Sequence, residues 1–217
     1  MNRIHWASTA RRETLMVKEF ELDPLAEVWI FVDAARGVQA ALPYTISDQP
    51  AGTLWQQWAV ELPPSTEEYT VSVAASLGQY FLRRGRAVGL VSWGQLLNVL
   101  SPDRGGRQLG KILEALALLR AEGDLPISAL VMAESRHLPR GSTVILVTPS
   151  VQEEVALAVD ILLRRGLRPV AVLLDAVSFG GSPGTAALAM AIRALSVPVC
   201  RVENGVDLGT TLSIAGN

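Results

Sequence analysis

Short apolar runs, each long enough for one strand, alternate along this chain with segments of helical spacing. The runs lie at 28–33, 86–93, 143–147, 169–174 and 197–202. Between them, apolar residues recur every three or four positions, as in helices that bury one face. Strands that alternate with covering helices pair in parallel through right-handed crossovers. The sequence therefore predicts an α/β fold: a doubly wound, mostly parallel sheet of about five or six strands, with helices on both faces.

Local signals predict where several helices begin. Ser65 with Glu68, and Ser150 with Glu153, have the spacing of a capping box. Pro183 suits the first position of a later helix. Residues 95–100 predict a short edge strand, and a strongly amphipathic helix should follow the loop at 101–106. That helix is expected to bury Leu109, Ile112, Leu113, Leu116 and Leu119.

The 217 residues fit a single domain. Residues 1–25 are predicted to be an N-terminal edge extension with a strand at 15–21. The stretch 36–64 is irregular, and Trp55 and Trp58 are expected to anchor it to the core. No apolar run reaches the roughly 18 residues of a membrane span, and the first residues do not resemble a signal peptide. The chain is therefore expected to be soluble.

Charge and cysteine content disfavour several classes of function. The formal net charge is −2, so no basic excess points to nucleic acid. The one cysteine, Cys200, can form neither an internal disulfide nor a zinc cluster, and its apolar surroundings predict a buried strand residue.

In an open parallel sheet, ligands bind at the carboxyl ends of the strands, so residues there are the first candidates for a site. Asp33 ends the first strand, but Ala35 and Gly37 stand where a magnesium site would need hydroxyls. The strand at 143–147 ends in Thr148-Pro149-Ser150, without a second aspartate. We expect no metal, and we expect Asp33 to be a loop or helix-cap carboxylate.

Other motifs match a catalytic or nucleotide site only in outline. Residues 105–111 resemble a phosphate loop, but Ile112 replaces the hydroxyl that would hold magnesium. Residues 178–185 are rich in glycine without the dinucleotide-binding spacing. The two histidines, His5 and His137, lie away from the strand ends. These observations predict no cofactor and no catalysis.

The N-terminal segment resembles the signature of a bacterial family, domain of unknown function 58. Members carry an R-x-I-x-W-x-x-(S/T)-A-R pattern, which Arg3 to Arg12 matches, then an edge strand, then an apolar strand that ends in aspartate. Shorter matches lie at residues 66–68, 74–77, 88–90 and 103–105, and the resemblance covers nearly the whole chain. The resemblance implies a von Willebrand factor A-like fold. That fold has a metal-ion-dependent adhesion site, from which this chain departs at Ala35, Gly37 and Pro149, and no equivalent of the site's loop threonine is evident near residues 105–107.

The resemblance also implies a biological setting. Family members usually carry two membrane helices before the signature, and their genes often lie beside those of MoxR-type AAA ATPases. We therefore expect a non-enzymatic protein-interaction module, the cytoplasmic part of a membrane-anchored bacterial protein that acts with such an ATPase. The alternative is a small-molecule or nucleotide-binding enzyme on a Rossmann-like sheet. The expected interaction face consists of charged and polar residues at predicted strand ends: Asp33, Arg36, Asp103, Arg104, Ser150 and Asp175.

Overall fold

The structure is a computed structural model that describes residues 26–44, 62–206 and 208. Its strands form one sheet in the order β3-β2-β1-β4-β5-β6. Their bounds are β1 Val28–Val32, β2 Val88–Trp93, β3 Leu97–Asp103, β4 Thr143–Thr148, β5 Arg168–Leu174 and β6 Val199–Val202. The strand order and the mostly parallel pairing confirm the predicted doubly wound sheet.

Strand register defines two opposite edges of the sheet. Val28 is aligned with Val88 on one side and with Thr143 on the other, so the parallel strands begin together. We call this the amino edge, and the edge where these strands end the carboxyl edge. Only β3 is antiparallel among the described strands, and its last residue, Asp103, pairs with Val88. The chain therefore leaves β3 at the amino edge.

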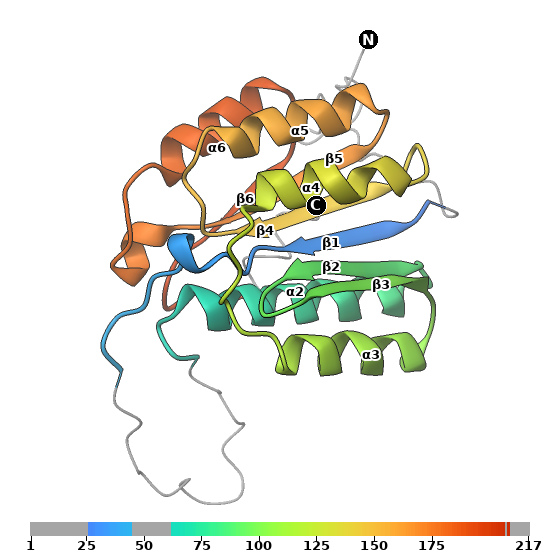
Figure 1. Cartoon of the computed structure of the whole chain (residues 1–217), viewed down its shortest axis with the longest axis horizontal. Coiled ribbons are helices and arrows are strands. Elements are labelled where there is room, and N and C mark those ends of the chain that lie inside the picture. Colours follow the sequence, from blue (N-terminus) through green and yellow to red (C-terminus); the bar gives the residue numbers. More distant parts are fainter. Residues whose placement is uncertain (1–25, 45–61, 207, 209–217) are drawn as a thin grey trace, which may run out of the picture.

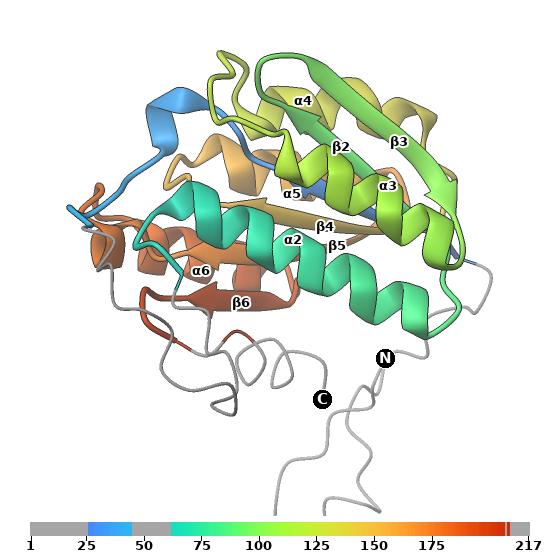
Figure 2. The same ribbon diagram turned by 90° about the horizontal axis from the view of Figure 1, so that it is seen from below.

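Helices cover both faces of the sheet (Figure 1). Their bounds are α2 Thr66–Arg83, α3 Gly106–Ala117, α4 Ile127–Glu134, α5 Glu154–Arg164 and α6 Thr185–Ala194. One face carries α2 and α3, which lie in front of the sheet in Figure 2. The other face carries α4, α5 and α6. Because the central strands are covered on both faces, all five residues of β1 and all six of β4 are buried.

Two hydrophobic clusters, one on each face, hold these layers together. Ile30 from β1 packs with Ile112 from α3, whereas its neighbour Phe31 packs on the opposite face with Leu162 from α5. Cys200 lies in β6 and is only 8% exposed, which confirms the prediction of a buried strand residue.

The structure corrects the predicted burial of Leu113, whose side chain is 45% exposed. Helix α3 packs on α2 and on the edge strand β3, so only a narrow stripe of it meets the core. Ile112, Leu116 and Leu119 form that stripe, Leu109 is half-buried, and Leu113 lies on its solvent side.

The predicted helix starts are also only partly right. Ser65 is the N-cap of α2, but its side chain makes no capping hydrogen bond. The N-cap of α5 is Glu153, not Ser150, and α6 begins after Gly184, beyond Pro183. The predicted strand at 15–21, His5, Trp55, Trp58 and the N-terminal signature lie outside the described residues. Among the described residues, no helix combines the length and apolar character needed to cross a bilayer.

Candidate functional site at the carboxyl edge

The carboxyl ends of β1 and β4 meet where the strand order reverses, and Asp33 lies at this junction. Its side chain is only 3% exposed. One carboxylate oxygen accepts a hydrogen bond from the Ala35 amide (3.1 Å), and the other accepts one from Thr148 Oγ1 (2.5 Å). Burial raises the pKa of Asp33 to about 6, against the opposing effect of these two hydrogen bonds.

The β4–α5 connection completes the other side of this junction. Thr148 Oγ1, the donor to Asp33, also accepts a hydrogen bond from the Ser150 amide (2.9 Å). Ser150 Oγ in turn accepts one from the Gln152 amide (3.3 Å). Ser150 is 3% exposed. Asp33 and Ser150 were both expected on an exposed interaction face, and their burial corrects that expectation.

Gln39 and Thr66 hold the segment after β1 in place, and sequence reasoning missed both. The Gln39 side-chain amide donates to the carbonyl oxygens of Asp33 and Ala35, each at 3.2 Å. Thr66 Oγ1 donates to Gln39 Oε1 (2.7 Å) and accepts from the Ala40 amide (2.9 Å). No signal in the sequence links these residues, because Thr66 lies on α2, far along the chain.

The oxygens around Asp33 do not fit a divalent cation. Both of its carboxylate oxygens accept hydrogen bonds from the protein, and Ala35 and Gly37 have no side-chain oxygen. Divalent cations require several oxygen ligands, usually with more than one carboxylate. Within the described residues, no group of three or more His, Cys, Asp or Glu side chains is placed to hold a metal. The hydrogen bonds around Asp33 therefore join the strand ends and do not form a cation site.

An open cleft of about 890 Å³ lies beside this network. Its walls come from the segment after β1, the end of β2, the α3–α4 connection and Gln152. Trp93 stands on the β2 side, where its indole N–H donates to Asp124 Oδ1 (3.1 Å). The exposed charged residues that line the cleft are Arg36, Glu122 and Asp124.

Close backbone packing fixes the α3–α4 connection against the ends of β1 and β2. Gly123 forms an isolated bridge with Ala35, donating to Ala34 O (3.0 Å) and accepting from the Arg36 amide (2.8 Å). A Cβ at Gly123 would clash with the Trp93 carbonyl oxygen. Gln95 holds the same connection in place. Its Nε2 donates to Leu118 O and its Oε1 accepts from the Arg120 amide, each at 3.1 Å. Sequence reasoning looked for the adhesion-site loop near residues 105–107, but residues 118–126 are the ones that reach this site.

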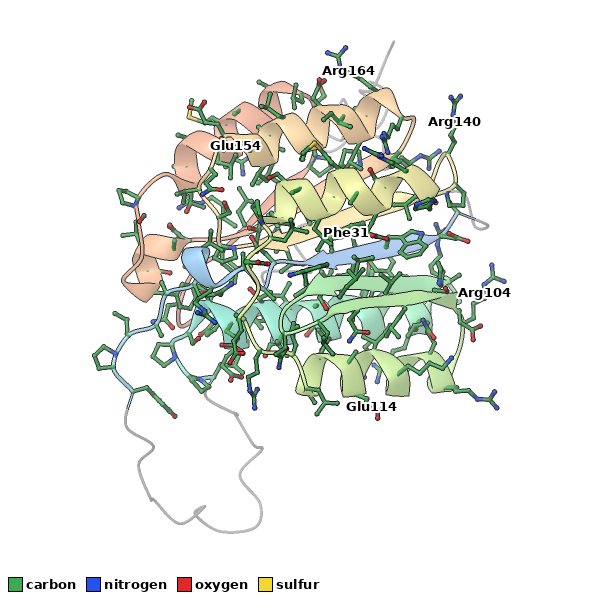
Figure 3. The ribbon with its side chains drawn as sticks, viewed as in Figure 1. Phe31, Arg104, Glu114, Arg140, Glu154 and Arg164 are labelled. Carbon is green, nitrogen blue, oxygen red and sulfur yellow. The ribbon has the colours of Figure 1, made fainter. Side chains whose placement is uncertain are left out.

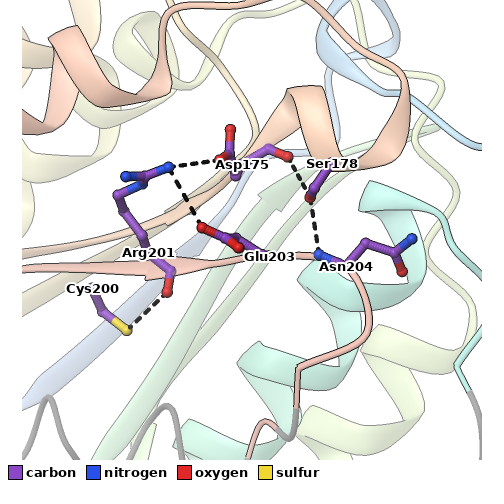
Figure 4. A network of polar contacts seen from close by, with 6 residues as sticks. All are labelled: Asp175, Ser178, Cys200, Arg201, Glu203 and Asn204. Atoms are coloured by element: carbon purple, nitrogen blue, oxygen red, sulfur yellow. Dashed lines mark hydrogen bonds and ion pairs between the residues drawn. The ribbon is translucent and has the colours of Figure 1, made fainter.

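The remaining residues of the predicted face separate into two groups. Arg36 is exposed on the cleft. Asp175, at the end of β5, forms an ion pair with Arg201 (2.6 Å), and Arg201 also approaches Glu203 (3.7 Å) (Figure 4). Asp103 and Arg104 lie at the amino edge instead, because β3 runs antiparallel to β2. The six residues therefore do not form one surface.

Residues 105–111 also lie at the amino edge, outside the candidate site. Helix α3 begins at Gly106, so Lys111 lies within the helix. The side chain of Gln108 is buried and donates to the carbonyl oxygens of Val88 (2.7 Å) and Ser101 (3.0 Å), beside an irregularity in the β2–β3 ladder. This segment is therefore a structural connection. His137 is exposed in a short 3-10 helix after α4.

Solved structures share this fold at low sequence identity. The conserved hypothetical protein BatB from Bacteroides thetaiotaomicron is 11% identical, with a TM-score of 0.56, over 88% of this chain and 95% of that one. Proximal thread matrix protein 1 from the mussel byssus is similar in two crystal forms. These are 10% and 12% identical, with TM-scores of 0.51 and 0.54, over 90% of this chain and 47% and 48% of that one.

Searches by sequence give no further guide to identity. No protein-family model matches the chain, and no curated protein matches it. At the identities above, the structural likeness establishes the fold and not the activity. Together with the six-stranded, mostly parallel sheet, it shows that this chain has a von Willebrand factor A-like fold.

Proposed function

We propose that this domain is a non-enzymatic protein-interaction module that binds its partner at the carboxyl-edge cleft. The observation that carries the proposal is the composition of the cleft. An indole, Trp93, lies beside exposed charges of both signs, Arg36, Glu122 and Asp124. Tryptophan and arginine are the residues most enriched at energetically important positions of protein interfaces, and complementary charges around them give orientation and specificity.

The framework of the cleft favours binding without large rearrangement. Residues 33–40 after β1 are held by Gln39 and Thr66, and the α3–α4 connection is held by Gln95 and by the Gly123 bridge. A partner that binds here therefore meets loops that are already ordered, which lowers the entropy lost on association.

The cleft lining contains two carboxylates but none of the other usual catalytic nucleophiles and bases. Among the described residues that line it, none is Ser, Thr, Cys, His or Lys. Covalent catalysis by a hydroxyl or thiol requires such a side chain with a base within hydrogen-bond reach. The two carboxylates are Glu122 and Asp124, and Asp124 accepts a hydrogen bond from the Trp93 indole. Asp33, beside the cleft, is buried and engaged by Thr148 and Ala35. These facts support a binding role over the alternative of an enzyme on a Rossmann-like sheet.

The resembled family suggests the partner and the setting. In this proposal the partner is a MoxR-type AAA ATPase, and the domain is the cytoplasmic part of a membrane-anchored bacterial protein. The mixed charge of the cleft suits a polar, transient interface, so the affinity should fall as salt rises.

The experiment is calorimetric titration of the purified domain with the MoxR-type ATPase of the same organism. Arg36→Glu and Asp124→Lys should each weaken binding about tenfold or more, as expected for charges at an interface centre. Arg104→Glu is the matched control, because it makes the same charge change at the amino edge and should bind as wild type does. Equal binding by all variants, or equal losses for Arg36→Glu and Arg104→Glu, contradicts the assignment of the cleft.

A further inference from the structure

Exposed arginines gather at the amino edge of the sheet, opposite the cleft. They come from the end of α2, the β3–α3 turn, the α4–β4 connection and the start of β5. We call the following set the arginine edge: Arg83, Arg104, Arg107, Arg136, Arg140 and Arg168. Figure 3 shows Arg104 and Arg140 projecting from this same end of the molecule, whereas Glu154 lies toward the other end.

Strand register places Arg168, and Asp103 next to Arg104, in one row across the sheet. Asp103, next to Arg104, is aligned with Val88, Val88 with Val28, Val28 with Thr143, and Thr143 with Arg168. At about 4.8 Å between strands, the four steps from β3 to β5 span roughly 19 Å. The positive charges therefore form a broad band and not a point.

Contacts within the described structure do not neutralise this band. None of the six arginines forms an ion pair with a described residue, whereas Arg164 beside them pairs with Asp160 (2.6 Å). Among the described residues, acidic side chains at this edge are fewer than basic ones: Glu27, Asp103, Glu134 and Asp160.

Favourable interactions with helix dipoles explain the position of only some of these arginines. Arg83, in the last turn of α2, has the favourable place for a cation on a helix dipole. Arg104 and Arg107 lie in an unfavourable place for a cation, just before and within the first turn of α3. That turn has no acidic residue. Arg140 and Arg168 lie outside helices altogether. Local stabilisation therefore does not explain why these arginines are here.

The carboxyl edge has the opposite charge character. Glu67, Glu122, Asp124, Glu153 and Glu154 lie there, with Arg36 and Arg120 as the exposed cations. The five residues of β1 alone separate the two edges by about 17 Å, which exceeds the Debye length of roughly 8 Å at physiological salt. In the part of the chain that the structure describes, charge is therefore segregated, and the described side chains at the amino edge are mainly arginine.

From this distribution we infer that the arginine edge binds the anionic headgroups of a lipid bilayer. The band lies on a flat end of the domain built from strand starts and helix ends, a shape that suits a planar surface (Figure 1). Tyr80, half-exposed beneath the Arg84 guanidinium (3.6 Å from the ring centroid), adds an amphipathic ring at the same end. The cleft would then face away from the membrane and stay open to a partner.

Duplex nucleic acid fits this edge less well. Reading or gripping a groove requires a helix or a two-stranded ribbon that projects into it. At this edge α2 and α5 end, so they present carbonyl ends to the surface, and β3 stays within the sheet. The inference does not depend on the proposed ATPase partner, and its test does not use that ATPase.

The test is co-sedimentation of the full chain with two kinds of vesicle. One kind is phosphatidylcholine alone, and the other also contains phosphatidylglycerol. Binding is expected only with phosphatidylglycerol, and high salt should abolish it. The double variant Arg104→Gln/Arg140→Gln should bind about 25-fold more weakly, since each arginine near an anionic surface contributes about fivefold.

The matched control is Arg36→Gln/Arg120→Gln, which removes the same charge from the carboxyl edge. It should bind vesicles as wild type does, and because all four side chains are exposed, both double variants should keep the wild-type melting temperature. Equal losses in the two double variants would show an effect of net charge and overturn the inference. So would an absence of binding to anionic vesicles, or tighter binding to duplex DNA than to them.

Discussion

Thr148 donates a 2.5 Å hydrogen bond to Asp33 across the junction between β4 and β1. The pair joins the ends of the two central strands at the point where the sheet reverses its winding. A hydroxyl can hold the aspartate here without a metal, but the carboxylate still loses most of its hydration. Its pKa of about 6 records that unfavourable burial, and it leads directly to a dependence of stability on pH.

The first prediction concerns that dependence. The pKa of Asp33 rises from 3.8 to about 6 on folding, so the native state holds this proton more tightly than the unfolded state does. The contribution of Asp33 to stability is fully present below pH 3.8 and is lost as pH rises through about 6. A shift of about two units corresponds to roughly 3 kcal/mol. Relative to Asp33→Asn, the wild-type protein should therefore lose about that much stability between acid and neutral pH.

Urea unfolding of both proteins across this pH range measures the difference directly. The Asn side chain can still accept from the Ala35 amide but not from Thr148 Oγ1. Because the loss of the Thr148 hydrogen bond does not depend on pH, the pH-dependent part of the difference reports the charge. Two stability curves that run parallel across the range would contradict the assignment of a buried, ionisable Asp33.

The second prediction is that Mg²⁺ and Mn²⁺ at millimolar concentration do not stabilise the protein. Both Asp33 oxygens are already hydrogen-bonded, and the neighbouring positions Ala35 and Gly37 supply no oxygen. Calorimetric titration with each cation should give no stoichiometric heat, with EDTA-treated protein as the reference. Tight binding that disappears in Asp33→Ala would prove this interpretation of the site wrong.

The third prediction compares two glycines with opposite surroundings. Gly123 lies against the Trp93 and Ala34 carbonyl oxygens, so Gly123→Ala must displace backbone and should cost about 1–3 kcal/mol. Gly110 lies inside α3 with open space around it, so Gly110→Ala should stabilise by up to about 1 kcal/mol. Thermal unfolding of the two variants should give melting temperatures on opposite sides of the wild-type value. A wild-type melting temperature for Gly123→Ala would mean that the 118–126 connection is not packed against the strand ends.

The central strands could be predicted because burial on both faces leaves a direct trace in the sequence. Residues 28–32, 143–148 and 169–174 are almost wholly apolar, as strands covered on both faces should be. The direction of β3 left no such trace, since an exposed edge strand alternates in the same way whichever way it runs. Asp103 and Arg104 were therefore assigned to the wrong edge.

The close contact at Gly123 and the clustering of arginines at one edge could not be predicted from the sequence either, because both depend on which residues become neighbours in the fold. Gly123 in a polar loop resembles any turn glycine until the Trp93 carbonyl oxygen is known to lie against it. Likewise, the arginines from 83 to 168 look scattered in a chain of balanced charge. Only the strand register brings them to one edge.

The last prediction tests the packing of α3 against that of β5. Leu113 was expected in the core and is 45% exposed, whereas Leu173 in β5 is fully buried. Leu173→Ala should therefore cost about 2–5 kcal/mol through lost transfer energy and the cavity left behind. Leu113→Ala should change stability by no more than about 0.5 kcal/mol, because it removes little buried surface and alanine favours a helix. Equilibrium unfolding in urea gives both values, with Leu116→Ala, a buried neighbour on α3 at 3% exposure, as the internal control. If Leu113→Ala destabilises as much as Leu116→Ala does, α3 is rotated from the position described. The buried stripe predicted from the sequence, which includes Leu113, would then be correct.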